Sequence, residues 1–147
     1  MRASPVTVYT DGSCDTTTGR GGWAYLVEVG GQRQQASGFE AGTTNNRMEL
    51  TAAVKALEAL TEPSRVTIVT DSEYLKKAFT DGWLERWQRN GWRTAGRQPV
   101  KNQDLWQRLL ELTSVHDVSW EWTRGHAGHE QNEIVDGLAL SARRQGR

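Results

Sequence analysis

The sequence has 147 residues, of which 36% are hydrophobic and 24% charged, and its 18 basic and 18 acidic side chains give a formal net charge of zero. This length suits one compact domain, so we expect residues 1–147 to form a single domain, and no apolar run approaches the ~20 residues that cross a bilayer. The first residues lack a hydrophobic secretory segment and the single cysteine cannot form an internal disulfide, so we expect a cytoplasmic protein with no membrane association.

Three strands are predicted first. Residues 6–13 are rich in β-branched and aromatic side chains, run into Asp11 and break at Gly12, and strands over 23–29 and 32–40 follow. Short turns join all three, which predicts an antiparallel meander. Because such strands are buried, the charge of Asp11 would cost several kcal/mol without a compensating cation.

A helix and a second acidic strand come next. The helix is expected from Met48 to about residue 60, with Thr44 or Asn45 as its cap, and it carries Glu49 on its apolar face. Glu49 lies near the helix N-terminus, whose positive end could stabilise its charge, so the position of Glu49 on the apolar face does not by itself indicate a functional site. The strand over 66–70 ends in Asp71, and a right-handed βαβ unit would bring the two strand-end aspartates to one sheet edge.

The remaining chain predicts helices over 73–80, 83–89, 102–112 and 131–143, a polar loop over 92–100, a strand over 118–122 and a loop over 123–129. Asp136 lies in the second turn of the last helix, beside its apolar face. Residues 76–108 carry eight basic and three acidic side chains and four of the seven tryptophans, whereas the flanking regions are net acidic. This favours contact with a polyanion, although a solvated helical face with core tryptophans would give the same pattern.

Four carboxylates therefore stand out: Asp11, Glu49, Asp71 and Asp136. One alternative is that these carboxylates lie apart in the fold, each accepting hydrogen bonds from nearby backbone amides. If they converge, their mutual repulsion calls for hard divalent cations, Mg²⁺ or Mn²⁺. Two such ions about 4 Å apart form a clamp for in-line attack on a phosphodiester.

Six sequence motifs are distributed over nearly the whole chain: Tyr9-Thr-Asp-Gly-Ser13, Thr44-Asn-Asn-Arg-Met-Glu49, Thr70-Asp-Ser72, Pro99-Val-Lys-Asn-Gln-Asp-Leu-Trp106, Trp122-Thr-Arg-Gly-His-Ala-Gly-His129, and Asn132-Glu133 with Asp136. These motifs, in the same order, resemble those of bacterial ribonuclease HI. The resemblance implies an α/β fold with a mixed five-stranded sheet in the order 3-2-1-4-5, the first three strands antiparallel and 1-4-5 parallel, helices on both sides and a basic protrusion, the handle. It implies an endonuclease that cleaves the RNA strand of RNA–DNA hybrids with two metal ions and leaves 5′-phosphate and 3′-hydroxyl ends.

The resemblance also assigns the catalytic residues. Asp11, Glu49, Asp71 and Asp136 match the metal-binding carboxylates, with Asp11 shared by both ions. His126 matches a histidine on a mobile loop that moves a proton or helps release product, its alternative being an ordinary surface histidine. We assign no catalytic role to His116 or His129, and Cys14 and the histidines fit no zinc-site spacing.

Substrate contacts are carried over in the same way, with the RNA–DNA hybrid as the partner. The implied nucleic-acid-binding residues are Ser13, Cys14, Thr17, Thr44, Asn45, Asn46, Ser72, Glu73, Trp83, Arg86, Arg89, Arg93, Arg97 and Lys101. Of these, Thr44 is expected at a DNA phosphate, and the residues from Trp83 to Lys101 form the handle. We expect a monomer; tethering to a single-stranded-DNA-binding protein occurs in the family, but no motif here tests it.

Three departures from the family pattern bear on substrate affinity and leave the metal ligands unchanged. Thr17 replaces an asparagine that helps hold substrate, Glu73 replaces a common glutamine, and the handle uses arginine and is less densely basic. We expect Glu73→Gln to tighten hybrid binding or to lower the Mg²⁺ concentration required. The alternative functions are another nuclease or recombinase of the same fold and a non-catalytic hybrid-binding module.

Overall fold

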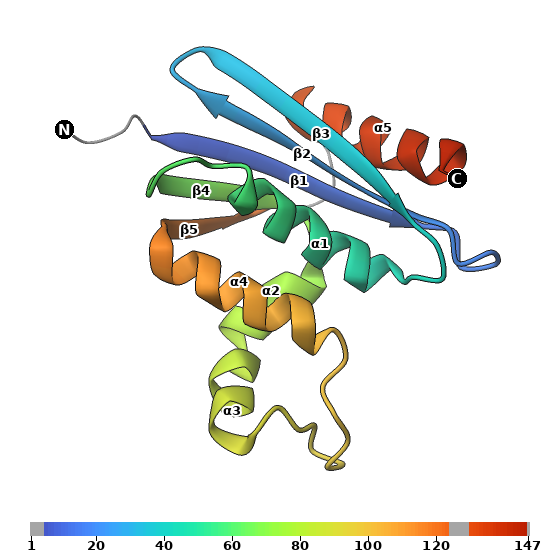
Figure 1. Ribbon diagram of the computed structural model, residues 1–147, viewed down its shortest axis with the longest axis vertical. Coiled ribbons are helices and arrows are strands. Elements are labelled where there is room, and N and C mark those ends of the chain that lie inside the picture. The colour runs from blue at the N-terminus through green and yellow to red at the C-terminus, as the bar shows by residue number, and fades with distance from the viewer. Residues whose placement is uncertain (1–4, 124–129, 147) are drawn as a thin grey trace.

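The structure is a computed structural model that describes residues 5–123 and 130–146 (Figure 1). Its sheet has five strands, β1 (Val6–Cys14), β2 (Gly21–Val29), β3 (Gln32–Glu40), β4 (Arg65–Thr70) and β5 (Asp117–Trp122). They are arranged in the order β3-β2-β1-β4-β5, with β1, β2 and β3 antiparallel and β1, β4 and β5 parallel. The expected topology is therefore confirmed.

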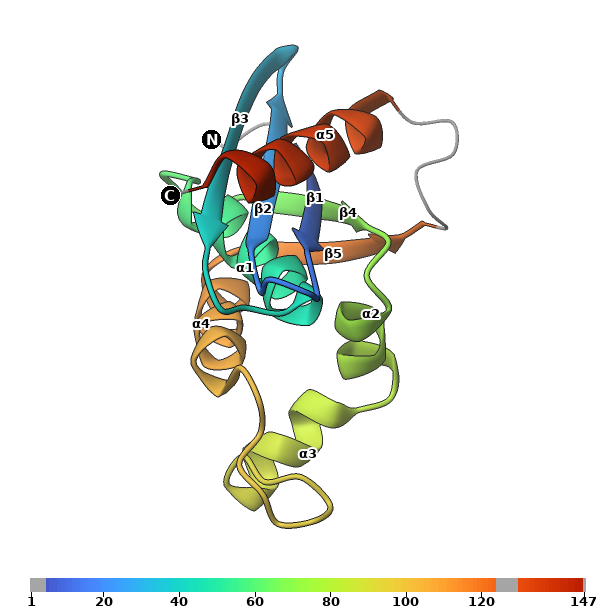
Figure 2. The same ribbon diagram turned by 90° about the vertical axis from the view of Figure 1, so that its right-hand side faces the viewer.

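Helices cover both faces of this sheet, which are best separated in Figure 2. The helices are α1 (Asn45–Glu58), α2 (Glu73–Thr80), α3 (Trp83–Asn90), α4 (Gln103–Val115) and α5 (Glu130–Gln145). The larger hydrophobic core lies between the sheet and α1, α2 and α4, and a smaller one lies between β2 and α5. Within the described part of the chain, no helix is both long and apolar enough to cross a membrane.

The end of the first strand differs from the prediction. β1 does not break at Gly12 but continues to Cys14, with Gly12 opposite Trp23 of β2. A Cβ atom at Gly12 would lie 2.4 Å from the backbone nitrogen of Glu49 and 2.5 Å from the carbonyl carbon of Met48. The glycine is required because α1 crosses β1 in direct contact, and not because the chain turns there.

The handle, formed by α3 and the loop of residues 91–102, projects away from the sheet (Figure 1). Its tryptophans pack on one another and on α4: between ring centroids, Trp87 lies 5.9 Å from Trp83, 6.1 Å from Trp92 and 5.8 Å from Trp106 of α4. Aromatic rings at these separations stabilise by packing as well as by burial. The tryptophans therefore form the hydrophobic base of the handle, as expected from the alternative interpretation of residues 76–108, a solvated helical face with core tryptophans.

Candidate active site

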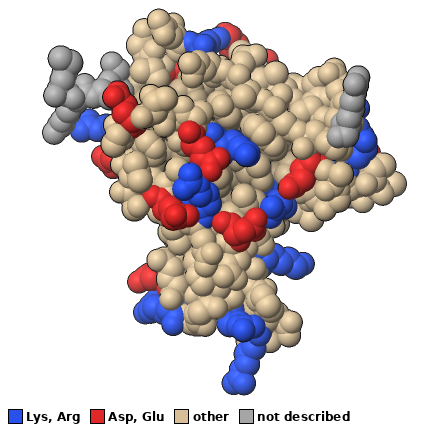
Figure 3. Space-filling view, viewed as in Figure 1, with Lys and Arg blue, Asp and Glu red and all other residues tan. Residues whose placement is uncertain are grey.

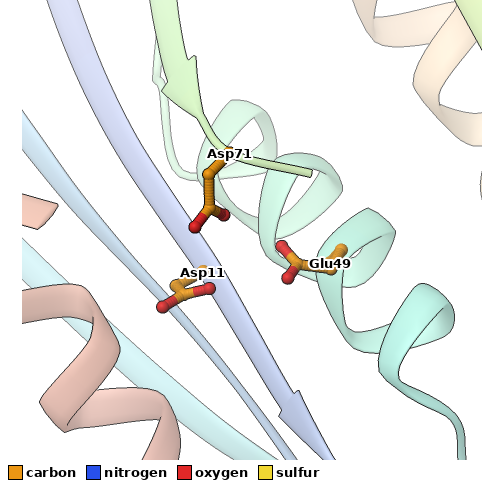
Figure 4. A group of neighbouring side chains, drawn as sticks. All are labelled: Asp11, Glu49 and Asp71. Carbon is orange, nitrogen blue, oxygen red and sulfur yellow. The ribbon is translucent and has the colours of Figure 1, made fainter. Parts of the chain in front are cut away.

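Three of the four singled-out carboxylates form one cluster. Asp11, Glu49 and Asp71 each offer an oxygen within 4.8 Å of the others. Figure 4 shows the three side chains converging from β1, from α1 and from the segment that follows β4. Asp11 and Glu49 are buried, with 4% and 6% of their surfaces exposed, and Asp71 is half-buried.

The register of the parallel strands explains this convergence. The last pair in the ladder between β1 and β4 is Tyr9 with Val69. Asp11 and Asp71 each lie two residues beyond this pair, so they are at the same height along the two parallel strands. β1 continues beside β2 whereas the chain after β4 turns into α2, so the two strands separate beyond this pair. Glu49, in the second turn of α1, reaches the opening because Gly12 lets the helix approach β1.

Burial and like charge dominate the electrostatics of the cluster. Burial and then the charge of Asp71 raise the pKa of Asp11 to about 8, although the Gly12 amide, which donates to Asp11 Oδ1 at 2.9 Å, partly offsets them. Burial and the charges of Asp11 and Asp71 likewise raise the pKa of Glu49 well above its usual range. Glu49 Oε2 is buried without a hydrogen-bond partner among the described residues. The helix N-terminus therefore does not satisfy Glu49 fully.

Asp136 lies on α5, on the opposite face of the sheet from α1, and its side chain is exposed. It is not one of the three residues within 4.8 Å of one another, but its charge and a side-chain hydrogen bond contribute to the raised pKa of Asp11. The expected convergence is thus tight for three carboxylates, with the fourth at its rim. An all-oxygen donor set with an unsatisfied buried oxygen fits a hard cation such as Mg²⁺.

The predicted substrate residues of the main body surround two helix N-termini. Thr44 caps α1 by accepting from the Arg47 amide at 3.1 Å, and Asn45 and Asn46 are exposed in the first turn. Ser72 caps α2 by accepting from the Leu75 amide at 3.2 Å, and only 5% of its surface is exposed. Its hydroxyl thus has a structural function, and substrate contact by Ser72 stays a prediction.

Other predicted contacts lie on the β1–β2 connection and at the start of α2. Ser13 and Cys14 are partly exposed at the end of β1, and the thiol of Cys14 lies 3.4 Å from the Thr43 carbonyl oxygen. Thr17 is exposed in the turn, and Glu73 is exposed as the first residue of α2.

The basic residues of the handle face solvent. Figure 3 shows lysine and arginine side chains gathered at the lower end of the protrusion. The exposed side chains are Arg86, Arg89, Arg93, Arg97 and Lys101. Arg89 makes a 3.7 Å ion pair with Glu85, and both partners are more than 70% exposed, so the charge stays accessible. Trp83 is partly buried against Tyr74 and Trp87, which favours a packing role for it.

Of the three histidines, the structure describes His116 alone. His116 is buried, and its Nδ1 accepts from the Ser64 amide at 3.1 Å, which is consistent with the absence of a catalytic role. His126 and His129 lie outside the described residues.

Sequence reasoning did not single out Arg143 on α5, which donates to the Ser13 hydroxyl at 3.0 Å. The only sequence signal for it was its position seven residues after Asp136, two turns along the same helical face.

Comparison with known proteins decides the family. The RNase H family model matches residues 3–144. This chain belongs to the RNase H family. A ribonuclease H from Pelobacter propionicus is 53% identical over 95% of this chain and 85% of its own length, and one from Halorhodospira halophila is 56% identical over 91% and 89%. The crystal structure of LC9-RNase H1, a type 1 RNase H with the type 2 active-site motif, matches with a TM-score of 0.83 and 36% identity, covering 97% of this chain and 73% of that one. The expected family and nuclease class are therefore confirmed.

Proposed function

We propose that this RNase H family member is an endonuclease that hydrolyses the RNA strand of RNA–DNA hybrids with two divalent metal ions, leaving 5′-phosphate and 3′-hydroxyl ends. The observation that carries the proposal is the buried cluster of Asp11, Glu49 and Asp71 with Asp136 at its rim. Such charges are costly in the absence of cations, and two hard cations would supply charge neutralisation at the attacking and leaving oxygens of a phosphodiester.

The chain's own residues hold this site in place. Asp11 would bind both ions, because its carboxylate interacts electrostatically with Asp71 and Asp136 and itself raises the pKa of Glu49. Its carboxylate is oriented by the Gly12 amide, and β1 stays paired with β2 at Asp11, so the ligand requires little reorganisation. His126 is proposed to assist proton transfer or product release near neutral pH.

We propose that substrate selection comes from groups around the cluster. A hybrid exposes 2′-hydroxyls on one strand only, in a wide minor groove, so short polar side chains suit recognition there. Ser13, which is partly exposed, and Asn45 and Asn46, which are exposed, would provide them, and Thr44 would contact a phosphate of the DNA strand. The exposed cations of the handle would bind further phosphates, and hybrid affinity should then fall steeply between 50 and 200 mM salt.

A direct assay compares RNA–DNA hybrid, duplex DNA and duplex RNA, each incubated with Mg²⁺ or EDTA. Metal-dependent loss of RNA from the hybrid alone, with end-labelling that shows 5′-phosphates, is the expected result. Cleavage of duplex DNA would instead favour another nuclease of this fold. Hybrid binding without cleavage would favour a non-catalytic module, which the presence of all four carboxylates argues against.

Substitution separates binding from chemistry. Asp11→Asn should abolish cleavage while binding of the hybrid persists in Ca²⁺, because only the metal cluster is changed. Asp117→Asn removes one exposed carboxylate from the start of β5 and serves as a matched control that keeps activity. Loss of binding by Asp11→Asn alone would indicate that the cluster holds the substrate and not the ions.

A further inference from the structure

A group of three arginines lies outside the carboxylate cluster and the handle. Arg20, Arg143 and Arg144, together with Asp15, line an open pocket of about 420 Å³. The pocket lies between the β1–β2 turn and the C-terminal end of α5. The views in Figures 1 and 2 place α5 and α3 at opposite ends of the molecule, so this arginine pocket is separate from the handle.

The charges of the pocket are only partly neutralised. Three guanidinium groups face one carboxylate, and Asp15 Oδ1 already accepts from the Thr17 amide at 2.9 Å and the Thr18 amide at 3.4 Å. Arg20 donates to the carbonyl oxygens of Arg144 and Gly146, so it caps the C-terminal end of α5. Arg143 and Arg144 make no ion pair with a carboxylate among the residues that the structure describes.

The pocket is connected to the proposed active site through Ser13. Arg143 donates to the Ser13 hydroxyl, and Ser13 follows the metal-ligand candidate Asp11 by two residues on β1. Arg143 also follows Asp136 by seven residues on α5, which puts the two on one helical face about 10 Å apart. At about 3.4 Å of duplex axis per nucleotide, this separation corresponds to roughly three nucleotides.

We propose that Arg143 and Arg144 bind a backbone phosphate of the nucleic-acid substrate about three nucleotides from the cleaved bond. The inference rests on the proposed function. It adds a second cationic contact at the other end of the molecule from the handle, supported by Arg20 and positioned by Ser13. Guanidinium groups suit this task because their paired donors match phosphate oxygens. The alternative is that these arginines only stabilise the C-terminal end of α5 through its dipole.

Single substitutions at the pocket separate the two explanations. Arg143→Gln and Arg144→Gln each remove one charge, and Arg65→Gln, at the exposed start of β4, removes one charge elsewhere as a matched control. The readouts are the salt dependence of hybrid binding in Ca²⁺, KM and kcat in Mg²⁺, and the melting temperature. We expect each pocket variant to lower the slope of log Kd against log salt by about 1 and to raise KM several-fold with kcat unchanged, as for loss of one phosphate contact.

Position is tested with hybrids that carry one uncharged methylphosphonate linkage at successive sites. Neutralising one linkage about three nucleotides from the cleaved bond should weaken binding by the wild-type protein but not by Arg143→Gln. The proposal is overturned if no linkage behaves this way, if the slope and KM match those of Arg65→Gln, or if only the melting temperature changes. Binding of inorganic phosphate that Arg143→Gln removes without any effect on hybrid affinity would also overturn it. A wild-type protein that neither binds nor cleaves the hybrid would instead refute the proposed function.

Discussion

Asp11→Asn should stabilise the metal-free protein while it abolishes catalysis. Asp11 is buried, and burial and the charge of Asp71 raise its pKa from the usual 3.8 to about 8. The folded state thus keeps a proton that the unfolded chain has already released. Stability should therefore fall as pH rises from about 4 to about 8 and stay level above that range. Asparagine keeps the shape of the side chain and removes the charge.

The magnitude follows from the width of this pH window. At pH 7 the separation from the usual pKa is roughly 3 pH units, and at about 1.4 kcal/mol per unit the charge costs at most about 4 kcal/mol. Because Asp11 also raises the pKa of Glu49, the cost is shared within the cluster, and we expect about 2 kcal/mol in practice. For a chain of this length that corresponds to a rise in melting temperature of roughly 4–8 °C.

The assay is thermal and urea unfolding of the wild type, Asp11→Asn and the control Asp117→Asn in EDTA between pH 4 and 9. The advantage of Asp11→Asn should be absent near pH 4 and should grow up to pH 8. Mg²⁺ at about 100 times its Kd should add about 2.7 kcal/mol to the wild type and less to Asp11→Asn. An Asp11→Asn protein that is less stable than the wild type in EDTA at pH 8 would refute this reasoning.

Backbone packing and two polar contacts give three further predictions. Gly12→Ala forces α1 away from β1 and should cost about 1–3 kcal/mol with loss of Mg²⁺-dependent activity, whereas Gly137→Ala, which meets no atom within 4 Å, should be neutral or stabilising in the same urea titrations. Arg47 pairs with Asp104 through two contacts of 3.1 and 3.2 Å, and a double-mutant cycle should give a coupling of about 0.5–1 kcal/mol because Asp104 is 65% exposed. Burial lowers the pKa of His116, so the contribution of this side chain to stability should fall as pH drops below about 6.5; the free energy of unfolding of the wild type minus that of His116→Asn should therefore decrease when unfolding is followed from pH 8 to 5.

Periodicity located the regular elements because their side chains alternate or repeat with the burial that the fold imposes. The strand over Gln32–Glu40 and the helix over Glu73–Thr80 were predicted with the bounds that the structure has. The prediction for β1 was wrong at Gly12 because a glycine after a buried strand is typical both of a turn and of close backbone contact. Only the position of α1 distinguishes them, and that position depends on contacts between segments far apart in the chain.

The basic segment shows a similar limit. Its composition predicted both charge and aromatic content, but composition does not tell which side chains face solvent. In the structure Trp87 and its aromatic neighbours pack inward, whereas arginines such as Arg93 and Arg97 face outward. Arg143 was overlooked because its significance depends on Ser13, 130 positions away in the sequence.

The carboxylate cluster depends on a feature of the sheet that no motif contains. The ladder between β1 and β4 ends at Tyr9 and Val69 while β1 continues beside β2, so the sheet opens next to Asp11. α1 covers one face and α5 the other, and a carboxylate from each reaches Asp11 at this opening: Glu49 directly and Asp136 from the rim. The early end of the ladder and the close approach at Gly12 are therefore as necessary to the site as the acidic residues themselves.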